Sequence, residues 1–229
     1  MKTNKSLFTV CILSFCLAVS AGYLRAQNHA SSKNTGVNLT FEDVKTGSLP
    51  AGWKVEATNQ KGDLATWQVI TDTTAPSGEK VLALTKTNHS FGGTFNLCWT
   101  HAITFLNGEI KVKFKAKTGE EDRGGGVIWR AQDRGNYYIS RYNPLENNFR
   151  IYYVKDEARK ILASARVKLP SGKWHELKIT QHGKHISGYL NGKKLLDVDD
   201  STFTKPGGVG LWTKADAVTS FDDFEIITN

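Results

Sequence analysis

The stretch EIKVKFKAK, residues 109–117, decides the fold. Its apolar residues stand at positions 110, 112, 114 and 116, and lysines alternate with them at 111, 113, 115 and 117. Because successive side chains of a β-strand point to opposite faces, this period of two predicts a half-buried strand. We expect the lysine face to meet solvent on an edge or outer strand, where lysines block edge-to-edge association. The alternative is a surface that attracts acidic glycans.

The same alternation continues on both sides of this strand, and it predicts an all-β protein. Turn residues separate the runs, and Asn191-Gly192 gives the strongest hairpin signal, because a type I′ turn needs positive φ at both central residues. Such short strands with frequent turns are typical of antiparallel sandwiches and barrels. Further strands are expected at residues 126–131, 136–142, 148–154, 160–167, 174–181, 185–190, 194–198, 209–212 and 221–227.

The composition divides the chain into three segments. Residues 1–26 have the features of a secretory signal peptide: Lys2 and Lys5 precede an apolar run at 7–19, and cleavage is expected after Ala21 or Ala26. That run is too short to span a bilayer, so we expect a secreted or periplasmic protein without a membrane span. Residues 27–38 are small and polar, which predicts a flexible lead-in, and residues 39–229 are expected to form one domain.

Charge and cysteine content exclude two classes of protein. The chain has 30 Lys and Arg against 22 Asp and Glu; removing Lys2, Lys5 and Arg25 with the signal segment leaves 27 against 22. This excess is too mild to predict nucleic-acid binding. Of three cysteines, Cys98 alone lies outside the signal segment, so we expect no intramolecular disulfide and a buried, unreactive thiol. The sequence gives no indication of the oligomeric state.

Several motifs resemble one group of exported bacterial proteins. They are FED at 41–43, LPAGW at 49–53, GGVIWR at 125–130, NYY at 136–138, WHEL at 174–177, GVGLWTKAD at 208–216 and FDDF at 221–224. Over nearly the whole mature chain, the sequence resembles the 3-keto-disaccharide hydrolase group, which is glycoside hydrolase family 16-like. The resemblance implies an antiparallel two-sheet jelly-roll sandwich of concanavalin A-like fold, with its first strand within 41–53 and a sugar-binding groove on its concave sheet.

Arginine and aromatic residues gather at 129–153 in a block that fits a carbohydrate groove. Aromatic rings pack on the apolar faces of sugars, and guanidinium groups bind hydroxyls or carboxylates. Arg150 and Tyr152 share one face of their strand, and residues 149, 151 and 153 form the core face, whereas the pattern at 136–142 leaves the faces open. The alternative is that the rings fill the core and the arginines are solvated. The candidate sugar-binding residues are Trp129, Arg130, Tyr138, Arg141, Asn143, Arg150 and Tyr152.

Asp43 and Asp222 are candidate metal ligands. In an extended chain, Asp43 lies on the same face as Leu39 and Phe41, and Asp222 lies on the same face as Phe224 and Ile226. Both carboxylates are therefore expected to point inward, where a carboxylate needs a partner. Related jelly rolls hold Ca²⁺ where the first and last strands meet, so the resemblance implies a structural calcium ion at this pair. The alternative is pairing with Lys or Arg, or hydrogen bonds from backbone N–H groups. No cofactor is expected to be required.

Three functions stay open at this point. The first is an exported carbohydrate-binding domain whose partner is a glycan. The second is a hydrolase acting on a glycoside or 3-keto-disaccharide. The related group carries an acid on the strand that here reads NYYISR at 136–141, so a carboxylate would have to come from a loop, such as Glu146 or Asp133. We therefore name no general acid or base. The third is a laminin-G-like protein-interaction module.

Overall fold

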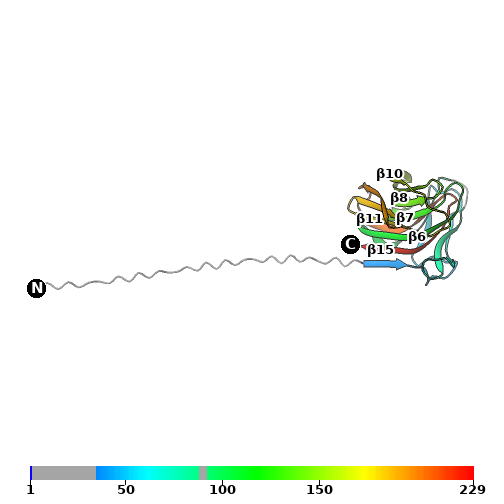
Figure 1. Cartoon of the computed structure of the whole chain (residues 1–229), viewed down its shortest axis with the longest axis horizontal. Helices are drawn as coiled ribbons and strands as arrows, with labels where there is room; N and C mark the ends of the chain where they lie inside the picture. The colour runs from blue at the N-terminus through cyan, green and yellow to red at the C-terminus, as the bar shows by residue number, and fades with distance from the viewer. Residues whose placement is uncertain (2–34, 88–91) are drawn as a thin grey trace. The chain divides into compact units, whose positions relative to one another are not determined.

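The computed structural model describes Met1 and residues 35–87 and 92–229. That part of the chain contains fifteen strands and no helix, arranged in two antiparallel sheets (Figure 1), which confirms the predicted all-β sandwich. One sheet has the order β13 (Lys193–Asp199), β12 (His185–Leu190), β11 (His175–His182), β6 (Gly108–Thr118), β15 (Val218–Thr228), β4 (Lys80–Lys86) and β3 (Thr66–Thr71), with β1 (Thr35–Leu39) also paired to β15. The other has the order β10 (Ala158–Arg166), β9 (Asn148–Lys155), β8 (Asn136–Asn143), β7 (Gly125–Asp133), β14 (Gly207–Lys214), β5 (Phe95–Phe105) and β2 (Lys54–Thr58).

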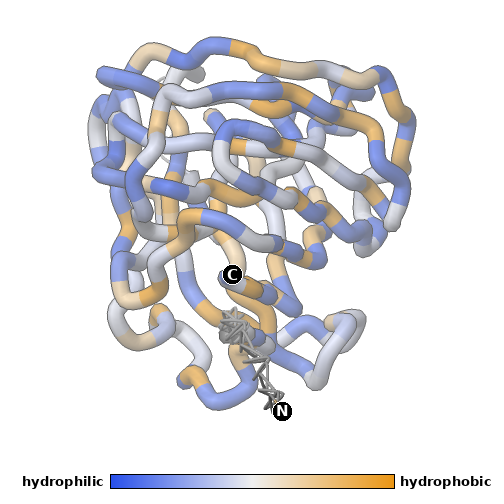
Figure 2. Tube along the Cα trace, turned by 90° about the vertical axis from the view of Figure 1, so that its left-hand side faces the viewer, coloured by the Kyte–Doolittle hydropathy of each residue, from blue (hydrophilic) through white to orange (hydrophobic). Residues whose placement is uncertain are grey.

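The main core is built from the facing sides of the two sheets. Hydrophobic and hydrophilic residues alternate along the strands (Figure 2), so that each strand contributes every second side chain to the core. Phe114 of β6 and Phe221 of β15 come from the eight-stranded sheet, and Phe149 of β9 comes from the seven-stranded sheet. All three side chains are fully buried. Cys98 is buried beside them as a free thiol, as expected, and burial raises its pKa.

A second apolar cluster covers the opposite side of the seven-stranded sheet, here called the outer face. Its residues hold the alternate positions of strands that also contribute to the main core, such as Ile139 beside Tyr138 on β8. The seven-stranded sheet is therefore apolar on both sides. The cluster consists of Phe95, Leu97, Trp99, Ile128, Ala131, Tyr137, Ile139, Tyr152, Val154 and Trp212.

The lysine stripe lies on β6, but β6 is an interior strand and not an edge. It pairs with β11 on one side and with β15 on the other. Each lysine meets a carboxylate from another strand or loop: Lys111 pairs with Glu225, Lys113 with Glu176, and both Lys115 and Lys117 with Asp72. These ion pairs balance the positive charge of the stripe, so attraction of acidic glycans, the alternative considered for it, gains no support from its charge.

The hairpin prediction at Asn191-Gly192 is confirmed. These two residues join β12 to β13, with Leu190 opposite Lys193. Their φ values are 48° and 78°, so both central residues have the positive φ that a type I′ turn requires.

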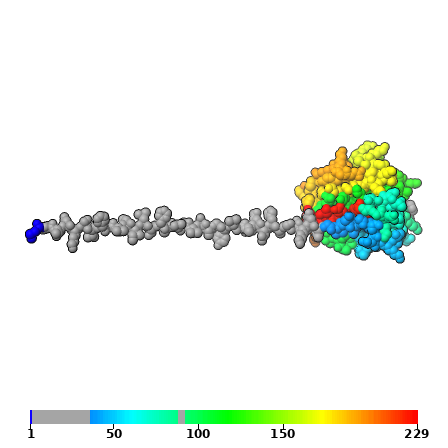
Figure 3. Space-filling view, turned by 60° about the horizontal axis from the view of Figure 1, so that its bottom comes forward, coloured from blue at the N-terminus to red at the C-terminus, as the bar shows by residue number. Residues whose placement is uncertain are grey.

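The N-terminal part of the domain differs from expectation in two ways. Residues 35–38 were expected in the flexible lead-in, but they belong to β1, which pairs along the last part of β15. Figure 3 shows the blue segment that contains β1 beside the last strand, in red. Residues 41–53 contain no strand, because Phe41, Gly47 and Gly52 all have positive φ and turn the chain. Of the predicted signal peptide, residues 2–26 lie outside the described residues, as do residues 27–34 of the predicted lead-in.

Candidate functional site

The structure separates the seven predicted sugar-binding residues, because neighbours on β7 and β8 point to opposite sides of the sheet. Trp129 and Tyr138 point into the main core, where their rings stack with centroids 5.5 Å apart. Trp129 Nε1 donates to Gln181 Oε1 at 2.5 Å, and Tyr138 Oη donates to Asp200 Oδ1 at 2.5 Å. Both side chains are fully buried in the core, so they are not available on a sugar-binding face.

Arg130 is also separated from the other predicted sugar-binding residues, because its guanidinium group binds backbone carbonyls of three loops. Its φ of 46° lies in the left-handed region, and the register of β7 against β8 shifts between Trp129 and Asp133. This irregularity directs the guanidinium to three backbone carbonyls: Leu106 O at 2.7 and 2.9 Å, Phe203 O at 2.6 Å and Gly183 O at 2.9 Å. Arg130 also borders a cavity of about 260 Å³ beside the β11–β12 hairpin. The residue therefore joins three loops to β7.

The other four predicted residues come together on the outer face. The Tyr152 hydroxyl accepts hydrogen bonds from Arg141 Nη2 at 3.0 Å and Arg150 Nη1 at 3.2 Å. Both guanidinium groups also reach Glu146 Oε2, at 2.8 Å from Arg141 and 3.4 Å from Arg150. Asn143 uses its side-chain oxygen to accept the backbone N–H of Glu146 at 3.2 Å, which holds the β8–β9 turn. We call these five residues the arginine–tyrosine cluster.

Glu146 acts as the anion of this cluster. Partial burial opposes its ionisation, but hydrogen bonds from Asn148 and Arg141 and the charges of Arg141 and Arg150 lower its pKa to about 2. A carboxylate that stays ionised at neutral pH can accept hydrogen bonds, but it is not suited to donate a proton. Asp133, the other loop acid considered, caps its own turn by accepting the backbone N–H of Gly135 at 2.7 Å.

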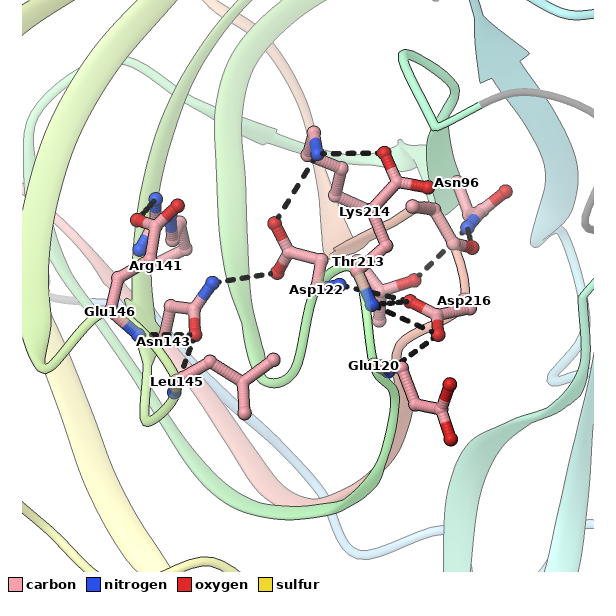
Figure 4. Close-up of polar contacts among 12 residues, drawn as sticks. Asn96, Glu120, Asp122, Arg141, Asn143, Leu145, Glu146, Thr213, Lys214 and Asp216 are labelled. Atoms are coloured by element: carbon pink, nitrogen blue, oxygen red, sulfur yellow. Dashed lines mark hydrogen bonds and ion pairs between the residues drawn. The ribbon is translucent and has the colours of Figure 1, made fainter.

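Asp122 is the functional candidate that the sequence reasoning missed. It lies in the loop between β6 and β7 and is buried beside the arginine–tyrosine cluster (Figure 4). Its Oδ1 accepts Asn143 Nδ2 at 3.0 Å, and its Oδ2 lies 3.6 Å from Lys214 Nζ. Burial raises the pKa of Asp122 to about 6, although the charges of Arg141 and Lys214 act in the opposite direction. A carboxyl that titrates near neutrality in this position is able both to donate and to accept a proton.

Asp216 fixes the loop that carries Asp122. Its carboxylate accepts the backbone N–H groups of Glu120 at 2.5 Å, Glu121 at 3.2 Å and Asp122 at 2.9 Å (Figure 4). These hydrogen bonds lower the pKa of Asp216 against the opposing effect of its burial. No sequence pattern marks the loop as part of a site, because its position is set by contacts with a residue almost one hundred positions away.

We expect the isosteric substitution Asp122→Asn to stabilise the fold at pH 7.5 but not at pH 4. Folded Asp122 titrates near pH 6 and an ordinary aspartate near 3.8, so the folded state holds the proton more tightly. The free energy of unfolding therefore falls as pH rises from about 4 to 6. The gain at pH 7.5 should reach at most about 3 kcal/mol. Urea unfolding at both pH values measures it, and an equal effect at pH 4 and 7.5 would contradict the assignment.

The two predicted metal ligands lie in different surroundings. Asp43 is exposed, whereas Asp222 is fully buried and its Oδ2 accepts the backbone N–H of Ser77 at 3.0 Å. Near Asp43, Lys80 Nζ donates to the carbonyls of Glu42 at 2.6 Å and Val44 at 3.1 Å. In the described part of the chain, no group of three or more His, Cys, Asp or Glu is placed to hold a metal ion. These oxygens already have donors, and calcium binding stays a prediction.

The fold of this chain is similar to that of several solved structures. One is the carbohydrate-binding module CBM66 from Bacillus subtilis, with a TM-score of 0.58 and 20% identity over 76% of this chain and 94% of that one. The cellulose induced protein Cip1 has a TM-score of 0.57 and 16% identity over 84% and 96%. The Bacillus licheniformis beta-glucanase has a TM-score of 0.56 and 11% identity over 87% and 99%. At these identities the likeness shows the fold alone.

Sequence comparison gives a more specific result. No curated protein matches the chain. The sequence model of the 3-keto-alpha-glucoside-1,2-lyase-like domain matches residues 29–227, which include all of the site described above. The resemblance found in the sequence motifs is thereby confirmed, and this chain belongs to the 3-keto-alpha-glucoside-1,2-lyase-like domain family.

Proposed function

We propose that this chain binds a carbohydrate on the outer face of its seven-stranded sheet, at the arginine–tyrosine cluster and Asp122. The observation that carries the proposal is the meeting of two guanidinium groups at the Tyr152 hydroxyl, next to a buried carboxyl. Sugars present several hydroxyls within a few ångströms of one another. A compact set of fixed donors and acceptors matches that chemistry, since charged hydrogen-bonding groups bind more strongly than neutral ones.

Two further observations support a carbohydrate ligand. The side chains of Arg150 and Glu146 are partly exposed on this face, so their polar atoms are accessible to a sugar. Among proteins of similar fold, one is named as a carbohydrate-binding module and another as a beta-glucanase. Export through residues 1–26 fits an extracellular glycan and remains part of the proposal.

The substitution Arg150→Ala tests this proposal. Arg150 is partly exposed, so its removal should leave the melting temperature nearly unchanged while weakening glycan binding at least tenfold. A glycan array identifies the ligand, and isothermal titration calorimetry gives the affinities. Tyr152→Phe, which removes the shared hydroxyl, should weaken binding in the same direction.

Lys178→Ala provides the matched control. Lys178 forms a partly exposed ion pair with Glu109 on the eight-stranded sheet, so this variant loses a cation and an ion pair away from the proposed site. Its affinity should equal that of the unmodified chain. If no glycan on the array binds, the proposal fails and the laminin-G-like interaction module becomes the favoured alternative.

A second function, cleavage of a 3-keto-glycoside, is favoured by the family and by Asp122. Elimination across C1 and C2 of such a sugar takes a proton from C2, which the C3 carbonyl acidifies, and delivers one to the departing glycosidic oxygen. A carboxyl with a pKa of about 6 suits either transfer. Glu146, whose pKa is about 2, would instead orient the arginines. In this case Asp122, rather than Glu146 or Asp133, carries the proton.

The two functions are distinguished by product release. If the chain is an enzyme, incubation with 3-keto-disaccharides should release a monosaccharide, and Asp122→Asn should reduce the rate by at least one hundredfold. Glu146→Gln should reduce it less, because its role is positional. If 3-keto-disaccharides bind without being cleaved, the enzymatic function is excluded and the binding function stands.

A further inference from the structure

Arg159 occupies an unusual position on the outer face. It lies on β10, at the edge of the seven-stranded sheet, and its guanidinium carbon is 4.5 Å from the centre of the Tyr152 ring. The centres of the Phe95 and Trp212 rings lie 4.8 and 5.9 Å away. Cation–π contact with three rings holds the guanidinium group beside the arginine–tyrosine cluster, with which it shares Tyr152.

The guanidinium group of Arg159 is incompletely satisfied. Its Nη1 is buried without a hydrogen-bond partner, and no carboxylate in the described part of the chain hydrogen-bonds to this side chain. Nearby, Arg141 Nε is likewise buried and unpartnered. Burial of Arg159 lowers its pKa, and the smaller opposing effects of Tyr152 and of the Asp122 charge do not cancel this shift. Arg159 is nevertheless partly exposed, so a ligand can reach it.

The carboxylates of this region are committed to other partners. Glu146 binds Arg141, Asn148 and Arg150, and Asp122 binds Asn143 and lies beside Lys214. Glu121 precedes Asp122 in the same loop, and its Oε1 lies 3.9 Å from Lys214 Nζ. Arg159 therefore combines two properties on this face. Its guanidinium group contacts three aromatic rings, and no carboxylate of the described residues forms an ion pair with it.

We infer that the sugar bound on this face carries a carboxylate, as a uronic acid does, and that Arg159 binds that carboxylate. The inference rests on the proposed function, since it names the class of sugar for the same site. A guanidinium group presents paired N–H donors that match the two oxygens of a carboxylate. The three rings fix its plane before the ligand arrives, so that little side-chain freedom is lost on binding.

Matched pairs of acidic and esterified sugars test the inference. The probes are oligogalacturonate, oligomannuronate and cellobiouronic acid, each with its methyl ester, titrated into the full chain by calorimetry. At least one acid should bind ten times more tightly than its ester, and this preference should weaken as NaCl is raised. Arg159→Met should abolish the preference, and Arg159→Lys, which keeps the charge but loses the paired donors, should retain part of it.

Lys160→Met is the control for a lost cation. Lys160 is the next residue on β10 and therefore points to the other side of the strand, where it lies 6.0 Å from the centre of the Tyr153 ring. This variant should keep the full preference for the acid. If the esters or neutral sugars bind as tightly as the acids, the inference is overturned and the proposed function stands. If neither these probes nor the glycan array shows binding, both are overturned.

Discussion

Replacing Trp129 by alanine should lower the free energy of unfolding by about 3–5 kcal/mol, the range typical of a large aromatic side chain removed from a core. Trp129 is fully buried between the sheets, and its ring stacks on Tyr138. The substitution also leaves Gln181 Oε1 without its donor. For a domain of this size, the melting temperature should fall by roughly 6–20 °C.

The conservative variant Trp129→Phe separates packing from the hydrogen bond. It keeps most of the apolar volume but cannot donate to Gln181, so we expect an intermediate loss of stability. Urea unfolding monitored by circular dichroism measures all three proteins. A Trp129→Ala variant that keeps its stability but loses glycan binding would contradict the core position and restore Trp129 to the sugar-binding face.

The substitution Arg130→Ala should destabilise the fold by about 3 kcal/mol or more. It leaves the carbonyls of Leu106, Gly183 and Phe203 without their side-chain donor, and an acceptor that stays unsatisfied in a buried position costs about 1–3 kcal/mol. Some of this loss is recovered at Gly183, which is exposed, because water can reach its carbonyl. The expected result is a cooperative transition at lower urea concentration, with glycan affinity at the arginine–tyrosine cluster unchanged.

Arg130→Lys provides the control for charge. An ammonium group retains the positive charge but cannot reach three carbonyls in separate loops with a rigid planar fork, so stability should lie between those of the alanine variant and the unmodified chain. If Arg130→Ala unfolds at the same urea concentration as the unmodified chain, the three-loop role assigned to this residue is wrong.

Local patterns in the sequence were sufficient to predict an all-β protein and its strands from residue 109 onward, whereas the choice of a sandwich over a barrel came from the family resemblance. Alternation at 109–117 and the Asn191-Gly192 pair depend on neighbouring residues, and both predictions are confirmed. The interior position of β6 in its sheet could not be predicted from local patterns, because it depends on pairing with β11 and β15, which are distant in sequence. Residues 41–53 were wrongly expected to include a strand, since a motif likeness does not report the positive φ of Phe41.

The candidate site was predicted in part. Arg150 and Tyr152 were correctly placed on one face, because Phe149 and Ile151 mark the other side of β9 as the core face. The neighbouring strand β8 has aromatic residues on both sides, Tyr137 on the outer face and Tyr138 in the core, so hydropathy could not separate its faces. Asp122 was missed because its raised pKa comes from burial by the folded chain, which no spacing within a loop reveals.

The position of β15 has a consequence for how the molecule is made. β15, the last strand, has eleven residues and lies inside the eight-stranded sheet, where it pairs with β6, β4 and β1. During synthesis, β1 cannot pair until β15 has been made, because these two strands are far apart in the sequence. The sheet therefore closes only after β15 has left the ribosome, and folding depends on contacts of long sequence separation, which form slowly.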